Sequence, residues 1–156
     1  PRPILKKINI VNVIKKSLDF IKMTSKSSVN LITKDKEIFI NGDEDQLNRV
    51  FINLIKNSQE AIDEISKKDT KFKGNIDIEI DNNNDYIVCR LTDNGSGITD
   101  PKKAMTPYFT TKKTGTGLGL PIVTKIINEH LGDFSIRNKK KGKGTIISIS
   151  LPKLNA

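Results

Sequence analysis

The sequence contains few of the residues on which secreted and membrane-embedded proteins depend. Its 156 residues include one cysteine, Cys89, and no tryptophan. A single cysteine excludes a disulfide framework within the chain, so we expect a reducing compartment and a small, buried Cys89 inside its apolar run. No apolar run approaches the roughly 18–20 residues of a membrane span, and no signal peptide is recognisable. We therefore expect a cytoplasmic chain that is long enough for one domain with its own core.

Aromatic residues make up only 5% of the chain, whereas basic residues exceed acidic ones and give a formal net charge of +9. A basic domain can bind nucleic acid, but here the lysines are spread over every segment without interleaved aromatic residues that could stack on bases. A solvated basic surface is the favoured interpretation. A basic nucleic-acid-binding module is the alternative from another functional class, and it would bind with a steep salt dependence and be indifferent to Mg-ATP.

Hydrophobic periodicity predicts helices interspersed with strands that can pair antiparallel. Apolar residues recur at helical spacing in 11–24, from about 43 to 67 and in 117–131, and Gly132 is a candidate C-cap of the last helix. The expected strands are 7–10, 29–33 and 37–40 around a turn at 34–36, 75–80 and 86–91 as a hairpin, 133–137 and 145–151. This pattern predicts an α+β fold, a two-layer α/β sandwich with about three main helices on one face of a mixed sheet.

A glycine-rich run, Thr114-Gly115-Thr116-Gly117-Leu118-Gly119-Leu120, opens the last predicted helix. Glycines let the backbone approach a ligand, and a helix N-terminus offers unpaired N–H groups and a favourable dipole to a phosphate. The same run is compatible with a flexible connector. Its interpretation depends on whether other motifs suited to a nucleotide accompany it.

Three further motifs precede this run. Asn53 and Asn57 lie one turn apart on the long predicted helix, where an amide oxygen can coordinate Mg²⁺ or simply be tolerated beside the apolar stripe. The loop 93–97 (DNGSG) follows a strand and offers the Asp93 carboxylate to an exocyclic amino group such as that of adenine, or forms a plain β-turn. Segment 107–113 (PYFTTKK) brings hydroxyl and ammonium groups close to the glycine run, or anchors a loop through Phe109.

The order of these motifs resembles that of the sensor histidine kinases. Residues 53–61 (NLIKNSQEA) are similar to the N box of that family, 93–97 to its first glycine box, 107–112 to its F box and 115–120 to its second glycine box. Gly144-Thr145 and Leu151-Pro152 resemble the strand that closes the same domain. The resemblance covers nearly the whole chain, and the run 106–123 is most similar to the nitrogen-regulation branch.

This resemblance implies the Bergerat ATP-binding fold of the GHKL superfamily, with ATP and Mg²⁺ as cofactors. Asp93 would bind the adenine amino group with Gly97 and Thr145 near the base. Asn57 would hold Mg²⁺ with support from Asn53, and 98–114 would be a mobile ATP lid. The implied cofactor-binding residues are Asn53, Asn57, Asp93, Gly95, Gly97, Ile98, Thr110, Thr111, Lys112, Gly115, Thr116, Gly117, Leu118, Gly119, Leu120 and Thr145, of which Asn53, Asn57 and Lys112 are the implied catalytic residues.

Two departures from the family pattern define what this chain is expected to lack. Some members carry a cation one turn after the metal-binding asparagine, but here Glu60 stands there, so Lys112 or Lys113 is the substitute candidate. The family phosphorylates a histidine on a separate helical dimerisation domain, and His130, the only histidine here, is expected to have a surface or cap role. We therefore expect 1–6 to be a linker remnant from that upstream domain and 7–156 to be the catalytic and ATP-binding domain.

The implied reaction is transfer of the γ-phosphate of Mg-ATP to a histidine outside this chain. The implied partners are the helical phosphoacceptor domain of the same parent protein and a downstream response regulator. No nucleic acid is implied, and a membrane would be reached only through parent segments outside the chain.

Other interpretations stay within the same fold. ATP-driven clamps such as gyrase-type topoisomerases carry a glutamate at the position of Asn53, where it activates water by accepting a proton. Because an asparagine cannot accept that proton, phosphoryl transfer to a partner is favoured over hydrolysis here. A protein-serine kinase of the anti-sigma type would need no helical histidine domain. A degenerate domain that signals by protein contact alone is opposed by the intact motifs.

Overall fold

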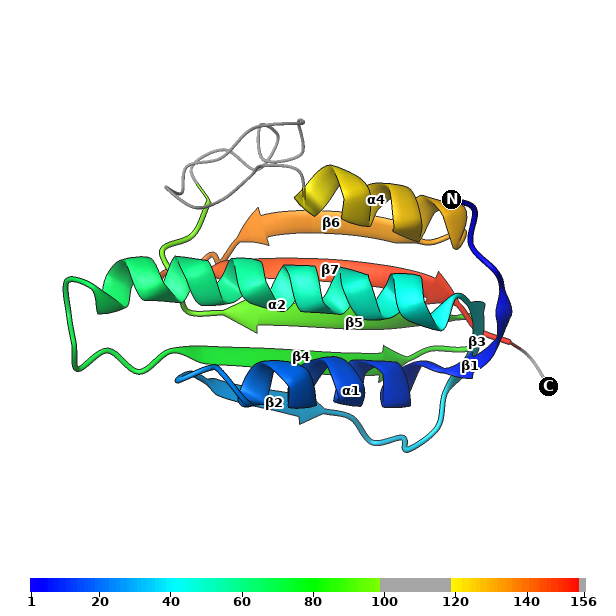
Figure 1. Ribbon diagram of the computed structural model, residues 1–156, viewed down its shortest axis with the longest axis horizontal. Helices are drawn as coiled ribbons and strands as arrows, with labels where there is room; N and C mark the ends of the chain where they lie inside the picture. Colours follow the sequence, from blue (N-terminus) through cyan, green and yellow to red (C-terminus); the bar gives the residue numbers. More distant parts are fainter. Residues whose placement is uncertain (99–118, 155–156) are drawn as a thin grey trace.

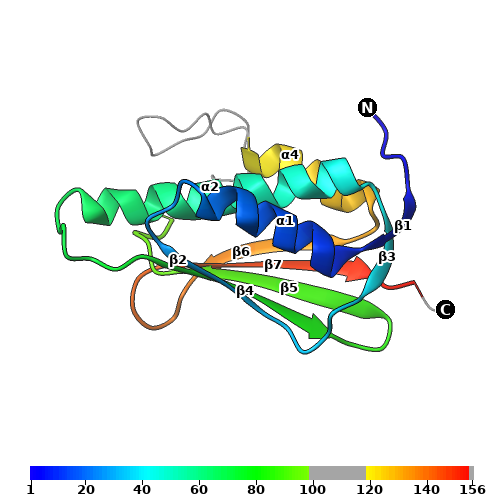
Figure 2. The same ribbon diagram turned by 60° about the horizontal axis from the view of Figure 1, so that its bottom comes forward.

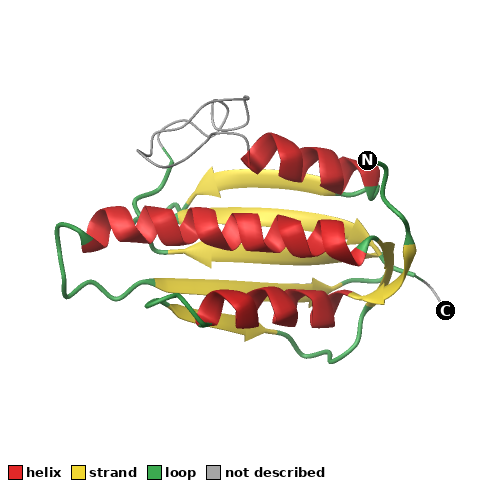
Figure 3. Ribbon diagram, in the orientation of Figure 1, coloured by secondary structure: helices red, strands yellow, loops and turns green. Residues whose placement is uncertain are grey.

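The computed structural model describes residues 1–98 and 119–154, and in these residues three helices cover one face of a five-stranded sheet (Figures 1 and 3). Figure 2 shows the two layers, helices above and strands below. The elements are β1 (Lys6–Asn9), α1 (Ile10–Lys22), β2 (Ser28–Ile32), β3 (Phe39–Gly42), α2 (Glu44–Ser66), β4 (Asn75–Asn82), β5 (Tyr86–Asp93), α4 (Gly119–Glu129), β6 (Asp133–Asn138) and β7 (Thr145–Pro152). The predicted α/β sandwich is confirmed. Among the described residues no helix is long and apolar enough to cross a bilayer.

The sheet is mixed and has the order β2-β4-β5-β7-β6. β2 runs parallel to β4, whereas β4, β5, β7 and β6 pair antiparallel, with β4 and β5 forming the predicted hairpin. The two short strands expected on either side of 34–36 both exist, but they do not pair with each other. β2 lies beside β4, and β3 pairs with β1 in a separate two-stranded ladder. Local patterning predicts both strands but cannot specify their partners, because strand pairing depends on contacts between residues far apart in the sequence.

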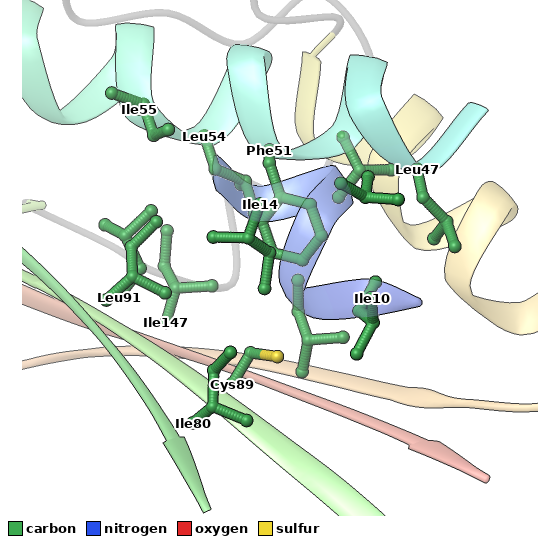
Figure 4. Close-up of a cluster of buried hydrophobic side chains, with 14 of the residues drawn as sticks. Ile10, Ile14, Leu47, Phe51, Leu54, Ile55, Ile80, Cys89, Leu91 and Ile147 are labelled. Atoms are coloured by element: carbon green, nitrogen blue, oxygen red, sulfur yellow. The ribbon is translucent and has the colours of Figure 1, made fainter. Parts of the chain in front are cut away.

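The core lies between the helices and the sheet (Figure 4). Apolar side chains of α2 recur at helical spacing and point toward the sheet, as Leu47, Phe51 and Leu54 show in this view. The central strands β4, β5 and β7 alternate, so that Ile147, Ile149 and Leu151 of β7 are buried while the residues between them are partly exposed. The sheet therefore has one covered face, as a two-layer sandwich requires.

Asp43 ties the start of α2 to two distant parts of the chain. Its Oδ1 accepts from the backbone N–H of Gln46 at 3.1 Å and caps the helix, while its Oδ2 accepts from the N–H of Ile4 at 2.9 Å. The hydrogen bond from Ile4 is the main cause that lowers the pKa of Asp43. Its own N–H donates to Nε2 of His130 at 2.9 Å. The N-terminal segment, α2 and the end of α4 are thus joined at one residue.

The end of α4 differs from the prediction in two ways. The residue with left-handed backbone is Leu131, at φ 60°, rather than Gly132. Gly132 follows it and donates to the carbonyl of Ile127 at 2.9 Å, and a Cβ on Gly132 would collide with the Ser150 carbonyl. His130 is buried rather than on the surface; its Nδ1 donates to the Ile126 carbonyl at 2.8 Å, so the predicted cap role is confirmed.

Candidate functional site

The buried carboxylate of Asp93, at the end of β5, is the centre of the candidate site. Only 2% of Asp93 is exposed. Its Oδ2 accepts from the hydroxyls of Ser58 and Thr145, both at 2.7 Å. Its Oδ1 accepts from the N–H of Gly95 at 2.9 Å and from the N–H of Thr145 at 3.3 Å. α2, the loop after β5 and the start of β7 therefore converge on one side chain.

The chemistry of this donor set suits a carboxylate that orients an amino group. All four donors to Asp93 are neutral, and a carboxylate offers about four lone-pair positions. Two donors are hydroxyls, which both donate and accept and can rotate. The hydroxyl of Ser58 or Thr145 can thus turn away from Oδ2 and leave a lone pair for an incoming N–H group. The residues present therefore fit a ligand with an exocyclic amino group, such as adenine.

The loop 93–97 is packed tightly against α2. A Cβ on Gly95 would lie 2.7 Å from Cβ of Ala61, so the missing side chain makes room for the helix. Ser96 donates from its N–H to the Ala61 carbonyl at 3.1 Å and from Oγ to Glu64 at 2.7 Å. Contact with α2 therefore requires glycine at 95.

The sheet side holds the same loop through Gly144 and through Asn138, which no sequence motif singled out. Gly144 has φ +132°, and a Cβ there would collide with the backbone carbonyl of Asp93. Gly97 has φ +85° and lies beside the side chain of Asn138, which bonds to both backbone polar groups of Ile98. The only sign of Asn138 in the sequence is its place at the end of a predicted strand. Its partner lies 40 residues away, and spacing alone cannot reveal such a pair.

Ser58 is the other functional residue that sequence reasoning missed. It lies among the apolar residues on the buried face of the long helix, and it is 3% exposed. A buried hydroxyl needs a partner, and Ser58 finds it in Asp93. The signal was present: a polar residue on the buried face of α2, next to Asn57.

Asn53 and Asn57 lie on α2 as predicted, both partly exposed at the border of its buried face. The described residues contain no group of three or more histidine, cysteine, aspartate or glutamate side chains placed to hold a metal ion. A metal at this helix would therefore need ligands of another kind, such as amide oxygens, water and phosphates, which Mg²⁺ commonly takes.

The structure places only part of the predicted phosphate-binding set. Gly119 and Leu120 begin α4, so the end of the glycine-rich run meets a helix N-terminus as predicted. The remaining residues of that set lie outside the described residues: Thr110, Thr111, Lys112, Lys113, Gly115, Thr116, Gly117 and Leu118, with segment 99–114 of the predicted lid.

Comparison with known proteins identifies the family to which the chain belongs. Residues 42–155 match the family described as histidine kinase-, DNA gyrase B-, and HSP90-like ATPase. The chain belongs to this ATPase family, which implies that it binds ATP. Its relatives include proteins named as sensor histidine kinases and sporulation kinases, so a serine kinase of the anti-sigma type and a nucleic-acid-binding module are not favoured.

Three relatives illustrate the similarity. The sensor histidine kinase ZraS of Salmonella typhimurium is 34% identical over 154 residues, which are 95% of this chain and 31% of that protein. Sporulation kinase C of Bacillus subtilis is 38% identical over 115 residues, 72% of this chain and 25% of that protein. An NtrY-like sensor histidine kinase of Rickettsia conorii is 39% identical over 109 residues, 69% of this chain and 17% of that protein. The chain thus spans less than a third of the length of each of these three relatives.

Solved structures agree in fold. The catalytic domain of histidine kinase ThkA superposes with a TM-score of 0.81 at 26% identity, and the match covers 96% of both chains. The mycobacterial sensor histidine kinase MprB also gives 0.81, at 21% identity, over 98% of this chain and 100% of that chain. These matches confirm the GHKL fold that the motifs predicted. The branch within the histidine kinases stays a prediction.

Proposed function

We propose that this chain is the Mg-ATP-binding catalytic domain of a sensor histidine kinase. In this proposal it presents the γ-phosphate of ATP to a histidine on a separate helical domain of the same parent protein, and a response regulator acts downstream. The observation that carries the proposal is the buried Asp93 carboxylate, held by neutral donors from three elements in a chain whose relatives are sensor histidine kinases.

Asp93 would orient the adenine ring by accepting from its amino group. The backbone N–H groups of Gly95 and Thr145 hold Oδ1 even when one hydroxyl turns away from Oδ2, so the position of the carboxylate is set before the nucleotide arrives. Thr145 and the backbone of Gly97 and Ile98 would line the base. A preformed acceptor lowers the ordering cost of binding, because fewer groups must be immobilised when the complex forms.

The asparagines of α2 would serve the phosphate end of the site. Asn57 would hold Mg²⁺ through its amide oxygen and Asn53 would support the metal or the phosphates. Bound Mg²⁺ would neutralise charge on the phosphates during transfer. Because the amide of Asn53 cannot act as a general base, this chain would favour transfer to a partner side chain over hydrolysis by water. Lys112, Thr110, Thr111 and the run 115–120 would complete the phosphate contacts.

Calorimetric titration with a non-hydrolysable ATP analogue, with and without Mg²⁺, tests the proposal directly. We expect saturable binding that Mg²⁺ strengthens, and the gain from Mg²⁺ should disappear in Asn57→Ala. A chain that binds no analogue would contradict the proposal at its first step.

Phosphoryl transfer is tested by adding a separately produced histidine-containing helical domain and γ-labelled ATP. We expect label on that domain and none on this chain, because both ring nitrogens of His130 are engaged inside the fold. Label on His130, or tight nucleotide binding without transfer to any helical partner from the same parent, would count against the kinase assignment.

A further inference from the structure

Asn138 makes two hydrogen bonds to one residue far away in the sequence. The N–H of Ile98 donates to Asn138 Oδ1 at 2.8 Å, and Asn138 Nδ2 donates to the carbonyl of Ile98 at 2.6 Å. A side-chain amide has one acceptor group and one donor group in a plane, so it can satisfy both backbone polar groups of a residue at once. Asn138 thus holds the Ile98 backbone in a defined orientation.

The register of the sheet places Asn138 opposite a residue of the candidate site. Asn138 ends β6 and is the cross-strand partner of Thr145, the first residue of β7. Thr145 donates to Asp93 with both its hydroxyl and its N–H. One pair of neighbours in the sheet therefore holds both ends of the loop 93–98, with Thr145 at its first residue and Asn138 at its last.

The loop needs such support because of its backbone. Gly97 has φ +85°, and glycine has the largest conformational freedom of all residues. On the other side, the N–H of Ser96 is held by the carbonyl of Ala61 in α2. The bonds from Asn138 fix the peptide that follows the glycine, so the loop is held from the helix layer and from the sheet.

We infer that Asn138 is a positioning residue for the base end of the nucleotide site. It acts through the Gly97–Ile98 backbone and keeps the loop that begins with Asp93 in its binding conformation. This inference rests on the proposed function, in which Asp93 binds adenine. Without Asn138 the loop must be ordered when the nucleotide binds, and ordering backbone at that moment weakens affinity.

The test compares Asn138→Ala with Asn82→Ala. Asn82 is also an exposed asparagine whose side chain hydrogen-bonds to other segments. It lies at the end of β4, whereas Asp93 pairs with a residue near the start of that strand. Calorimetry with ADP and with a non-hydrolysable ATP analogue gives the two affinities. We expect Asn138→Ala to weaken both by about the same factor, on the order of five- to tenfold. Asn82→Ala should leave both unchanged, with a similar melting temperature.

Amide hydrogen exchange adds a readout that does not depend on a nucleotide. The N–H of Ile98 should exchange slowly in the parent and Asn82→Ala, and rapidly in Asn138→Ala. Asn138→Asp preserves size but cannot donate to the Ile98 carbonyl, and it should also lose affinity for ADP. If Asn138→Ala or Asn138→Asp bound ADP as tightly as the parent, the inference would be overturned while the proposed function stood. Absence of nucleotide binding by the parent would overturn both.

Discussion

Asp93 shows how a single buried side chain can join three elements. Removing a carboxylate from water is costly unless hydrogen bonds replace the lost hydration. Here two hydroxyls and two backbone N–H groups do so, and they come from α2, the loop and β7. The same contacts that make burial tolerable also fix the direction of the carboxylate, so stability and ligand recognition depend on one set of bonds.

Replacing Asp93 by asparagine should weaken nucleotide binding. The substitution keeps the shape but removes the negative charge that strengthens the hydrogen bond to an amino group. We expect a loss of about 1.5–3 kcal/mol, or roughly 10- to 150-fold in Kd for an ATP analogue, measured by calorimetry. Asp77→Asn, on the same sheet but bonded to Asn30 and Asn75, is the matched control. An unchanged Kd in Asp93→Asn would remove Asp93 from the site.

At the scale of elements, a residue at the end of a helix can join segments that are distant in the sequence. Asp43 caps α2 and also accepts from Ile4 and donates to His130, so one cap links the N-terminal segment to the end of α4. In Figure 1 the N-terminal segment indeed reaches the end of the molecule where α4 finishes. An aspartate directly before an amphipathic helix is a local sequence signal for such a cap. The two long-range bonds followed only from the fold.

The end of α4 offers a test of backbone strain. Leu131 is 80% exposed and has φ 60°, a conformation that costs a leucine about 1–2 kcal/mol relative to glycine. Glycine there would relieve the strain, although its greater freedom in the unfolded chain offsets part of the gain. Leu131→Gly should therefore raise the free energy of unfolding by up to about 1 kcal/mol. Leu131→Val, whose branched side chain fits this backbone worse, should lower it. Urea unfolding measures both, and a destabilised glycine variant would contradict the account.

At the scale of the whole molecule, the helix layer closes one face of the sheet and excludes water from the core. Cys89 lies in the middle of that core on β5, and burial raises the pKa of its thiol to about 12. A thiol of this kind is a neutral apolar side chain at physiological pH, as the sequence predicted for it.

The raised pKa of Cys89 predicts how stability depends on pH. The unfolded thiol releases its proton near pH 9.0, whereas the folded thiol keeps it to about 12. The contribution of Cys89 is therefore fully present below pH 9 and falls as pH rises toward 12, by at most about 1.4 kcal/mol per pH unit. Urea unfolding between pH 8 and 10.5 should show a steeper loss in the parent than in Cys89→Ala, in which other titrating groups remain. Equal slopes would show that the folded thiol ionises as readily as the unfolded one, which would contradict the raised pKa.

The sequence by itself determined the two-layer class, the three helices and the motif that contains Asp93. These features depend on local hydrophobic periodicity and on residue preferences that act over only a few positions. Only the tertiary structure decided that β2 joins β4 rather than β3, that Ser58 binds Asp93, and that Asn138 holds Ile98. Such contacts join residues 35 to 47 positions apart, and their partners are chosen by which surfaces meet when the helices pack on the sheet. Residue types near each other in the sequence thus indicated the site, whereas tertiary packing determined which residues hold it in place.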